Sequence, residues 1–341
     1  MPRQLATLFF AFLLTGCATH VDRLGSRLGL APPLSVQQIA PDVQAEMQRR
    51  HDAAVAALGR NDLEGAVAAW RAYAEAAPFQ TPKTRDVRGY ITLLEREIAR
   101  RYARQAVTRE HELAAQKGDR LHVALMPFQL MNDAPGEVRP FNRAIMAMVA
   151  TDLSHAPGVK VLERGRIDAL LSEIQFSQSG LVNTATAVRS GRLLGAGTVV
   201  VGVVYNGAPP DRVYTGEGKY TISTTLNDVQ RGNLLGVQEA YGSQRDFMEM
   251  EKQIVHGILD LLGVKDRPAA VDRVHTRNWD AYAQFTLGLK YLAEDRFEQA
   301  QEAFAQALRF DPKFALAEAY HLDTPARALS VEQIRAEAGG G

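Results

Sequence analysis

Residues 189–204 constrain the fold of this chain more than any other stretch. The segment starts as the end of a helix pattern and breaks at Gly195-Ala196-Gly197, and a glycine just past the last helical residue is a common C-cap. Residues 198–204 then form a largely β-branched run without polar alternation, which is typical of a strand covered on both faces. We therefore expect this strand to lie centrally in a sheet and the fold to assemble around it.

Length and charge narrow the class of protein. The chain has 341 residues, enough for two or three units at roughly 150 residues per domain. Its 39 basic residues cancel its 39 acidic ones, so no net field favours a nucleic acid or an anionic membrane surface. We expect a globular protein without a nucleic-acid partner.

The first 17 residues resemble a bacterial lipoprotein signal peptide. Arg3 supplies a positive charge, residues 5–14 form an apolar core too short to span a bilayer, and Leu14-Thr15-Gly16-Cys17 matches a lipobox. Such a cysteine carries diacylglycerol and acyl chains such as palmitate, and Ala18 after it implies an outer-membrane anchor facing the periplasm. Cys17 is the only cysteine, which leaves no disulfide within one mature chain. The alternative is an ordinary secretory signal with an incidental cysteine.

The rest of the chain divides by periodicity and composition. The expected units are a tether at 18–45, a helical region at 46–118, an α/β domain at 119–264, a linker at 265–278, a helical region at 279–320 and a polar tail at 321–341. The helical patterns predict two helices around a turn at 59–62 and a long charged helix over about 84–116. The predicted fold class is α/β, a three-layer-like mixed-sheet domain covered by helices and flanked by N- and C-terminal helical hairpins.

Strand and helix patterns alternate within the α/β domain. Strands are expected at 121–128, 159–162, 198–204, 214–226 and 234–241, and helices at 141–153, 163–174, from 186 and at 246–262. The strand at 214–226 alternates polar and apolar residues, so we expect it to be half-exposed.

Charged residues of both signs alternate along the long helix. Arg96, Arg100, Arg101, Arg104 and Arg109 are interleaved with Glu95, Glu97, Glu110 and Glu112. Alternating signs favour a solvated helix face.

No group of residues has the spacing of a catalytic or cofactor site. Gly195-x-Gly197 follows a helix and precedes a strand, the reverse of a dinucleotide site. The eight histidines include no pair at metal-ligand spacing, and no nucleophile elbow surrounds Ser154-His155. We expect no enzyme activity, cofactor, metal or small-molecule substrate.

The charged residues Glu163 and Arg164, close to Asp168, can be interpreted in two ways. They could form an ion-binding cluster. We favour the alternative, in which Glu163 stabilises a helix N-terminus through the macrodipole by about 0.3–1 kcal/mol.

The α/β domain resembles the CsgG family of lipoproteins, best known for curli export. The resemblance covers residues 119–264, and its most specific residues are Pro127, Phe128, Glu163, Arg164, Gly195, Ala196 and Gly202. It implies a domain similar to the N-terminal domain of TolB and to LpoB-type activators of cell-wall synthases. These residues are structural rather than catalytic, so they indicate a fold and not a mechanism.

Residues 279–320 resemble a tetratricopeptide repeat. Gly288, Tyr291, Ala300, Phe304, Ala307 and Pro312 stand at the offsets of that repeat, in which small residues let two antiparallel helices touch. Ala66, Trp70 and Pro78 repeat part of the spacing as a degenerate copy. The resemblance implies protein partners, and the six residues are our predicted partner-binding set. A single repeat cannot bury its own face, so each copy must pack on the domain, on the other copy or on a partner.

Three functions follow from these predictions. We favour a non-enzymatic outer-membrane lipoprotein that acts as an assembly or scaffold component of an envelope or secretion system. It would bind envelope proteins, contact the membrane through the lipid on Cys17 and possibly form a homo-oligomer. The second is a pore-forming subunit like the curli exporter, with 214–226 and 234–241 as its membrane hairpin, although polar residues dilute the apolar face of that hairpin. The third is an LpoB-like activator of a peptidoglycan synthase.

Overall fold

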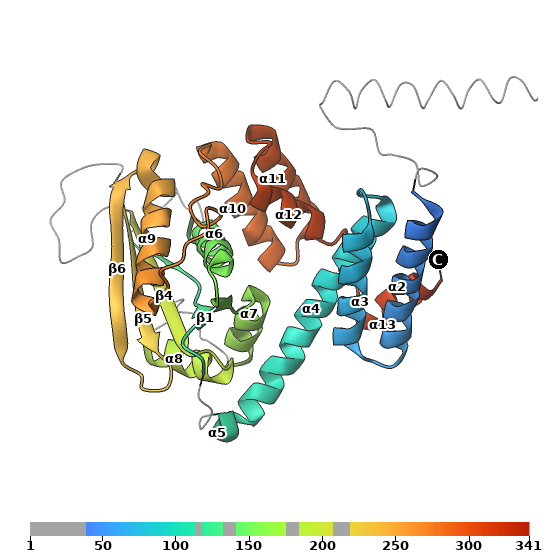
Figure 1. Ribbon diagram of the computed structural model, residues 1–341, viewed down its shortest axis with the longest axis horizontal. Coiled ribbons are helices and arrows are strands. Elements are labelled where there is room, and N and C mark those ends of the chain that lie inside the picture. Colours follow the sequence, from blue (N-terminus) through green and yellow to red (C-terminus); the bar gives the residue numbers. More distant parts are fainter. Residues whose placement is uncertain (1–38, 114–117, 132–140, 175–183, 207–218, 341) are drawn as a thin grey trace, which may run out of the picture.

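The computed structural model describes residues 39–113, 118–131, 141–174, 184–206 and 219–340. The predicted signal peptide, Cys17 and most of the tether lie outside these residues. A central α/β domain is connected to helices that precede and follow it in the chain (Figure 1). None of the described helices combines the length and the apolar character that crossing a membrane requires.

The central domain is built on one mixed sheet with the strand order β3-β1-β4-β5-β6, in which β2 also pairs with β4. The strands are β1 (His122–Leu125), β2 (Gln129–Met131), β3 (Lys160–Val161), β4 (Thr198–Asn206), β5 (Lys219–Asp228) and β6 (Leu234–Ser243). Strand β1 pairs in parallel with β3 and β4, and β2 pairs in parallel with β4. Strand β5 is antiparallel to both of its neighbours, β4 and β6.

Strand β4 lies in the middle of the sheet, and its side chains enter two separate cores. Val200 and Val204 pack with α6 (Phe141–His155) and α9 (Phe247–Leu262), which follows the short 3-10 helix η2 (Gln244–Asp246). Val199 and Val201 pack with α7 (Arg164–Glu173) and α8 (Thr184–Leu193) on the other face. The structure thereby confirms both the doubly covered central strand and the three-layer arrangement.

Two features of the family pattern have local structural causes. Gly195 ends α8 with a φ of 71°, a left-handed conformation that glycine adopts without strain. At Gly202 a Cβ would stand 2.4 Å from the ring of Phe128, so the glycine makes room for that ring in the core. The predicted strand at 121–128 is divided, because β1 ends at Leu125 and a new strand, β2, begins after Phe128.

The flanking helices differ from the prediction at both ends. They are α2 (Pro41–Gly59), α3 (Leu63–Ala76), α4 (Pro82–Thr108) and α5 (Glu110–Leu113) before the domain, and α10 (Trp279–Ala293), α11 (Phe297–Phe310), α12 (Ala315–Asp323) and α13 (Val331–Gly339) after it. Helix α2 begins within the predicted tether. The prediction of a polar tail at 321–341 is wrong. Helix α13 packs on the N-terminal helices, where Ile334 and Ala338 join the core around Trp70.

Helix α4 connects the three parts of the molecule (Figure 1). Its first half packs on α3 and on α12, and its second half packs on α7. Arg88 pairs with Asp323 at 2.8 Å, and the Thr92 hydroxyl donates to the Asp323 carbonyl at 2.7 Å. Helix α10 packs on α6. We call α2, α3 and α13 the N-terminal helical unit and α10–α12 the C-terminal helical unit.

Candidate functional site

A groove of about 760 Å³ lies where α4, the central domain and the C-terminal helical unit meet. We call it the junction groove. Its wall on α4 includes Thr92, Glu95, Arg96, Ala99, Arg100 and Arg104; the central domain contributes Arg143, Glu163, Arg164, Arg166, Asp168 and Ser172, among others; and the C-terminal unit contributes Leu289, Leu292, Ala293, Asp295 and Tyr320. Because its wall comes from three parts of the chain, the groove exists only when these parts are assembled.

The junction groove is rich in charges, most of them paired. Arg96 pairs with Asp295 and also donates to the Leu292 carbonyl at 2.8 Å, which ties α4 to the C-terminal unit. Arg164 and Asp168 lie 3.3 Å apart within α7. Salt bridges at such partly exposed positions each contribute little to stability, about 0–1 kcal/mol. Their main effect is to fix the orientation of the side chains that line the groove.

Burial shifts the pKa of two groups in the groove, Glu95 and Arg143. Burial raises the pKa of Glu95 although its partner Arg71 opposes the shift. Burial also lowers the pKa of Arg143, with a further contribution from the like charge of Arg164. Desolvation of each charged group is the common cause.

The predicted family residues Glu163 and Arg164 lie on the wall of this groove. Glu163 is the N-cap residue of α7, but its side chain makes no capping hydrogen bond and is 57% exposed. It lies 3.8 Å from Arg166 and 3.8 Å from Arg71. Its position at the N-terminus of α7 fits the macrodipole interpretation. Its carboxylate also lies within salt-bridge distance of Arg71 and Arg166.

The expected solvated helix face is present at Arg100 and Arg104, which are exposed. Arg96 departs from it, because it is partly buried and pairs with Asp295. All three arginines line the junction groove. Their spacing of four residues places them on one face of the helix. The four-residue spacing of these arginines was the sequence signal for the α4 wall of the groove. The alternation of basic and acidic residues along the helix made this signal hard to recognise.

The predicted partner-binding residues of the repeat are mostly internal. Gly288, Ala300, Phe304 and Ala307 are buried, and a Cβ on Gly288 would stand 2.4 Å from the Phe304 ring. Tyr291 is half-buried under the guanidinium of Arg296, and Pro312 is exposed after α11. The four buried residues shape the helix pair rather than a contact surface, so partner binding by the repeat as a whole stays a prediction.

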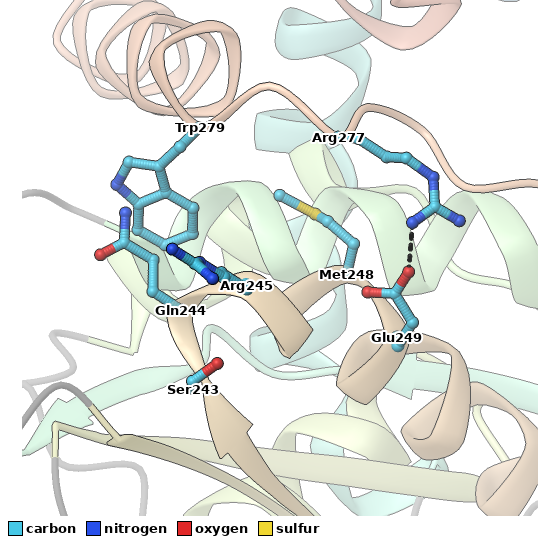
Figure 2. A pocket seen from close by; sticks show the side chains of 7 residues that line it. All are labelled: Ser243, Gln244, Arg245, Met248, Glu249, Arg277 and Trp279. Carbon is cyan, nitrogen blue, oxygen red and sulfur yellow. Dashed lines mark hydrogen bonds and ion pairs between the residues drawn. The ribbon is translucent and has the colours of Figure 1, made fainter.

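A second hollow, of about 580 Å³, lies between the start of α9 and the start of α10 (Figure 2). Arg277 and Glu249 form an ion pair at 2.5 Å on one side, and Trp279 and Arg245 lie on the other. Trp279 stacks on Tyr282 with 5.3 Å between ring centroids. This hollow is formed by fewer elements than the junction groove, and it holds none of the predicted site residues.

A buried ionic cluster connects α6 and α9 to residues 265–278. Lys252 pairs with Asp152 and lies 3.2 Å from Glu251, while His275 Nε2 lies 3.0 Å from Asp152. Burial, aided by the nearby Asp152, raises the pKa of Glu251 well above its ordinary value. Asp152, Glu251 and His275 are close enough to hold a metal ion, but the Lys252 ammonium already supplies a positive charge between the carboxylates. These residues are far apart in the sequence, so spacing could not reveal the cluster.

A protein family and a solved structure are similar to parts of this chain. Residues 132–207 match the family described as curli production assembly/transport component CsgG. The LpoB C-terminal domain from Salmonella enterica is a similar solved structure, with 14% sequence identity, a TM-score of 0.27 and coverage of 41% of this chain and 94% of that one. No curated protein sequence matches this chain. The family match confirms the predicted CsgG resemblance, and the matched range contains Glu163, Arg164, Gly195, Ala196 and Gly202.

Proposed function

We propose that this protein, whose central domain is CsgG-like, is a non-enzymatic assembly component of the cell envelope. In this proposal the lipid on Cys17 anchors it in the outer membrane, with the folded part in the periplasm. A segment of a partner protein binds in the junction groove. The matched family is described as an assembly and transport component, which supports a role through protein contacts.

The observation on which this proposal rests is the construction of the junction groove from three parts of the chain. The α4 wall and the C-terminal wall are held together by Arg96, Asp295 and the Leu292 carbonyl. Clefts at domain junctions are common binding sites in proteins. A partner that contacts all three walls would sense whether the helical units are docked on the domain.

The other two functions have less support in the structure. The hairpin considered for a pore is formed by β5 and β6, and α9 packs against both strands. The first part of that predicted hairpin, residues 214–218, lies outside the described residues. No observation on the described residues specifically favours activation of a peptidoglycan synthase, so we build on the scaffold function.

Site-specific photo-crosslinking in intact cells tests the groove. A photoreactive residue at Ser172 or Arg100, both exposed on the groove wall, should produce discrete adducts with an envelope protein. The same residue at Gln253, exposed on α9 and outside the groove, is the matched control. If neither groove position gives an adduct that is absent from the control, the proposed function is wrong.

The lipid anchor is tested separately. Cys17→Ser should move the protein from the outer-membrane fraction to the soluble periplasmic fraction, because a signal cysteine that cannot be acylated leaves no anchor. A variant that stays in the membrane fraction would contradict the anchoring.

A further inference from the structure

Two half-buried hydrogen-bond donors in the junction groove have no acceptor among the residues that the structure describes. Arg143 lies in the first turn of α6 and Tyr320 on α12; both line the groove and both are half-buried. Within the part of the chain that the structure describes, the guanidinium of Arg143 makes no ion pair or hydrogen bond, and the hydroxyl of Tyr320 makes no hydrogen bond. The two residues come from different units, so they line one groove only in the assembled molecule.

A half-buried arginine without an ion pair or a hydrogen bond is unfavourable for folding. A guanidinium remains charged in proteins, and withdrawing an unpaired charge from water costs free energy. Asp168 on α7, one of the carboxylates that attract Arg143, is already paired with Arg164 at 3.3 Å. The like charge of Arg164 adds to the cost, since it lowers the pKa of Arg143 together with burial. Attraction by Asp168 and Glu294 opposes the lowering of this pKa only in part, and neither carboxylate forms an ion pair with Arg143.

The missing group must accept hydrogen bonds and should be negatively charged. Tyr320 is fixed by ring contacts with Phe285 and Phe304, at 5.4 and 5.7 Å between centroids. Its hydroxyl can donate to an acceptor of a segment bound in the groove, and the planar fork of Arg143 suits a carboxylate of that segment. Leu289 and Leu292 offer apolar surface on the same wall, where the methylene groups of a peptide would pack.

We propose that Arg143 binds a carboxylate side chain, and that Tyr320 donates to another acceptor, in an acidic segment of the partner protein. This inference rests on the proposed function and names the chemistry that the groove recognises. Arg100, exposed on the α4 wall and without an ion pair in the described residues, adds positive charge for neighbouring acidic residues. The volume of about 760 Å³ accommodates several residues of a chain rather than one ion.

Peptide binding to the purified lipidated protein in detergent tests the inference. The probe is a fluorescent, C-terminally amidated peptide of alternating Glu and Ala, and the matched probe has Gln in place of Glu. We expect saturable binding of the Glu peptide only, weakened by salt. Arg143→Met should weaken it about tenfold or more, and Tyr320→Phe about fivefold. Arg245→Met, at the second hollow (Figure 2), should leave binding unchanged.

Absence of Glu-peptide binding, or equal binding by Arg143→Met, would overturn the inference. Stability supplies an independent measurement, because a purely structural arginine would stabilise the fold. We expect unliganded Arg143→Met to melt at the wild-type temperature or above, and Arg96→Met, which loses its contacts with Asp295 and Leu292, to melt lower. A clear fall in the melting temperature of Arg143→Met would also overturn it.

The crosslinking experiment separates this inference from the proposed function. Adducts at Ser172 that persist at full yield in Arg143→Met would leave the scaffold function intact and reject the carboxylate site. If wild-type adducts disappear in Arg143→Met, both proposals are supported. The absence of groove adducts in the wild type would reject the proposed function itself.

Discussion

Trp70 donates its indole N–H to Nδ1 of His51, with 3.2 Å between the nitrogens. The other ring nitrogen, Nε2, lies 3.2 Å from the carbonyl oxygen of Ala338 in α13. An indole N–H only donates and a carbonyl only accepts, so the imidazole is neutral and its proton is on Nε2. One buried histidine thus connects the N-terminal hairpin to the last helix of the chain.

Acidification should therefore loosen the N-terminal helical unit. Burial, together with Lys83, lowers the pKa of His51 below its ordinary value of 6.5. A lowered pKa in the folded state means that the stabilisation is present above the ordinary pKa and is lost as pH falls through the lowered value. We therefore expect the free energy of unfolding of this unit to decrease as pH falls below 6.5.

Urea unfolding followed by tryptophan fluorescence measures this loss. The chain has two tryptophans, so Trp279→Phe leaves Trp70 as the local probe. Burial also lowers the pKa of His321, and His321→Gln in the same background removes that contribution. A profile that is equally steep after His51→Gln would contradict the assignment.

Helix α13 should be needed for the stability of the N-terminal helical unit. Ile334 is 1% exposed in the core with Trp70 and Leu58. Ile334→Ala should therefore cost about 2–4 kcal/mol, measured by the same fluorescence of Trp70. Glu332→Ala, at an exposed position of the same helix, should change the stability by about 0.5 kcal/mol or less. Equal effects of the two variants would show that α13 is not part of this core.

The error at α13 shows where local sequence patterns stop being informative. Ser330 and Gln333 form a capping box in the structure, and this signal was present in the sequence. Yet α13 has nine residues, and an isolated helix of that length is marginal in water. Its contacts with α2 stabilise it, and those contacts join opposite ends of the chain. By contrast β4, whose burial is encoded in its own run of valines, was predicted with its central position.

The junction groove was hidden from sequence analysis for the same physical reason. The spacing of Arg96, Arg100 and Arg104 marks one face of α4, but only the fold shows that this face meets Asp295. Arg143 and Tyr320 belong to different units, and no periodicity relates them. Gly195 and Gly202 were recognisable from the family resemblance. In the structure Gly195 follows the end of α8, and Gly202 lies against the ring of Phe128.

A rise in pH above the ordinary pKa of a glutamate should weaken the contact between α6 and α9 through Glu251. Burial, with a contribution from Asp152, raises the pKa of Glu251 well above the ordinary value of 4.5. For a raised pKa, the stabilisation is present below the ordinary value and is lost as pH rises through the raised one. Wild-type stability should thus fall relative to Glu251→Gln as pH increases above that ordinary value.

Chemical denaturation of both proteins over a pH series measures the difference. Glu302→Gln, which alters an exposed carboxylate on α11, should give a curve parallel to the wild type. If the Glu251→Gln curve is also parallel to the wild type, Glu251 does not change its protonation on folding in the expected direction.

The packing of Phe128 against Gly202 predicts strong coupling between these positions. A Cβ at residue 202 would stand 2.4 Å from the Phe128 ring, and Phe128 is 2% exposed. Gly202→Ala should therefore cost about 1–3 kcal/mol through overpacking, and Phe128→Ala about 3–5 kcal/mol through the cavity it leaves. In the double variant the new methyl group occupies part of that cavity. The summed cost should then fall short of additivity by at least about 1 kcal/mol.

Urea unfolding of the four proteins in this double-mutant cycle measures the coupling. Gly165→Ala is the matched control, because a Cβ there meets nothing within 4 Å and alanine stabilises a helix by up to about 1 kcal/mol relative to glycine. Additive costs in the cycle, or a tolerated Gly202→Ala, would show that the ring does not require the glycine. Gly202 would then owe its place in the family pattern to some property other than this contact.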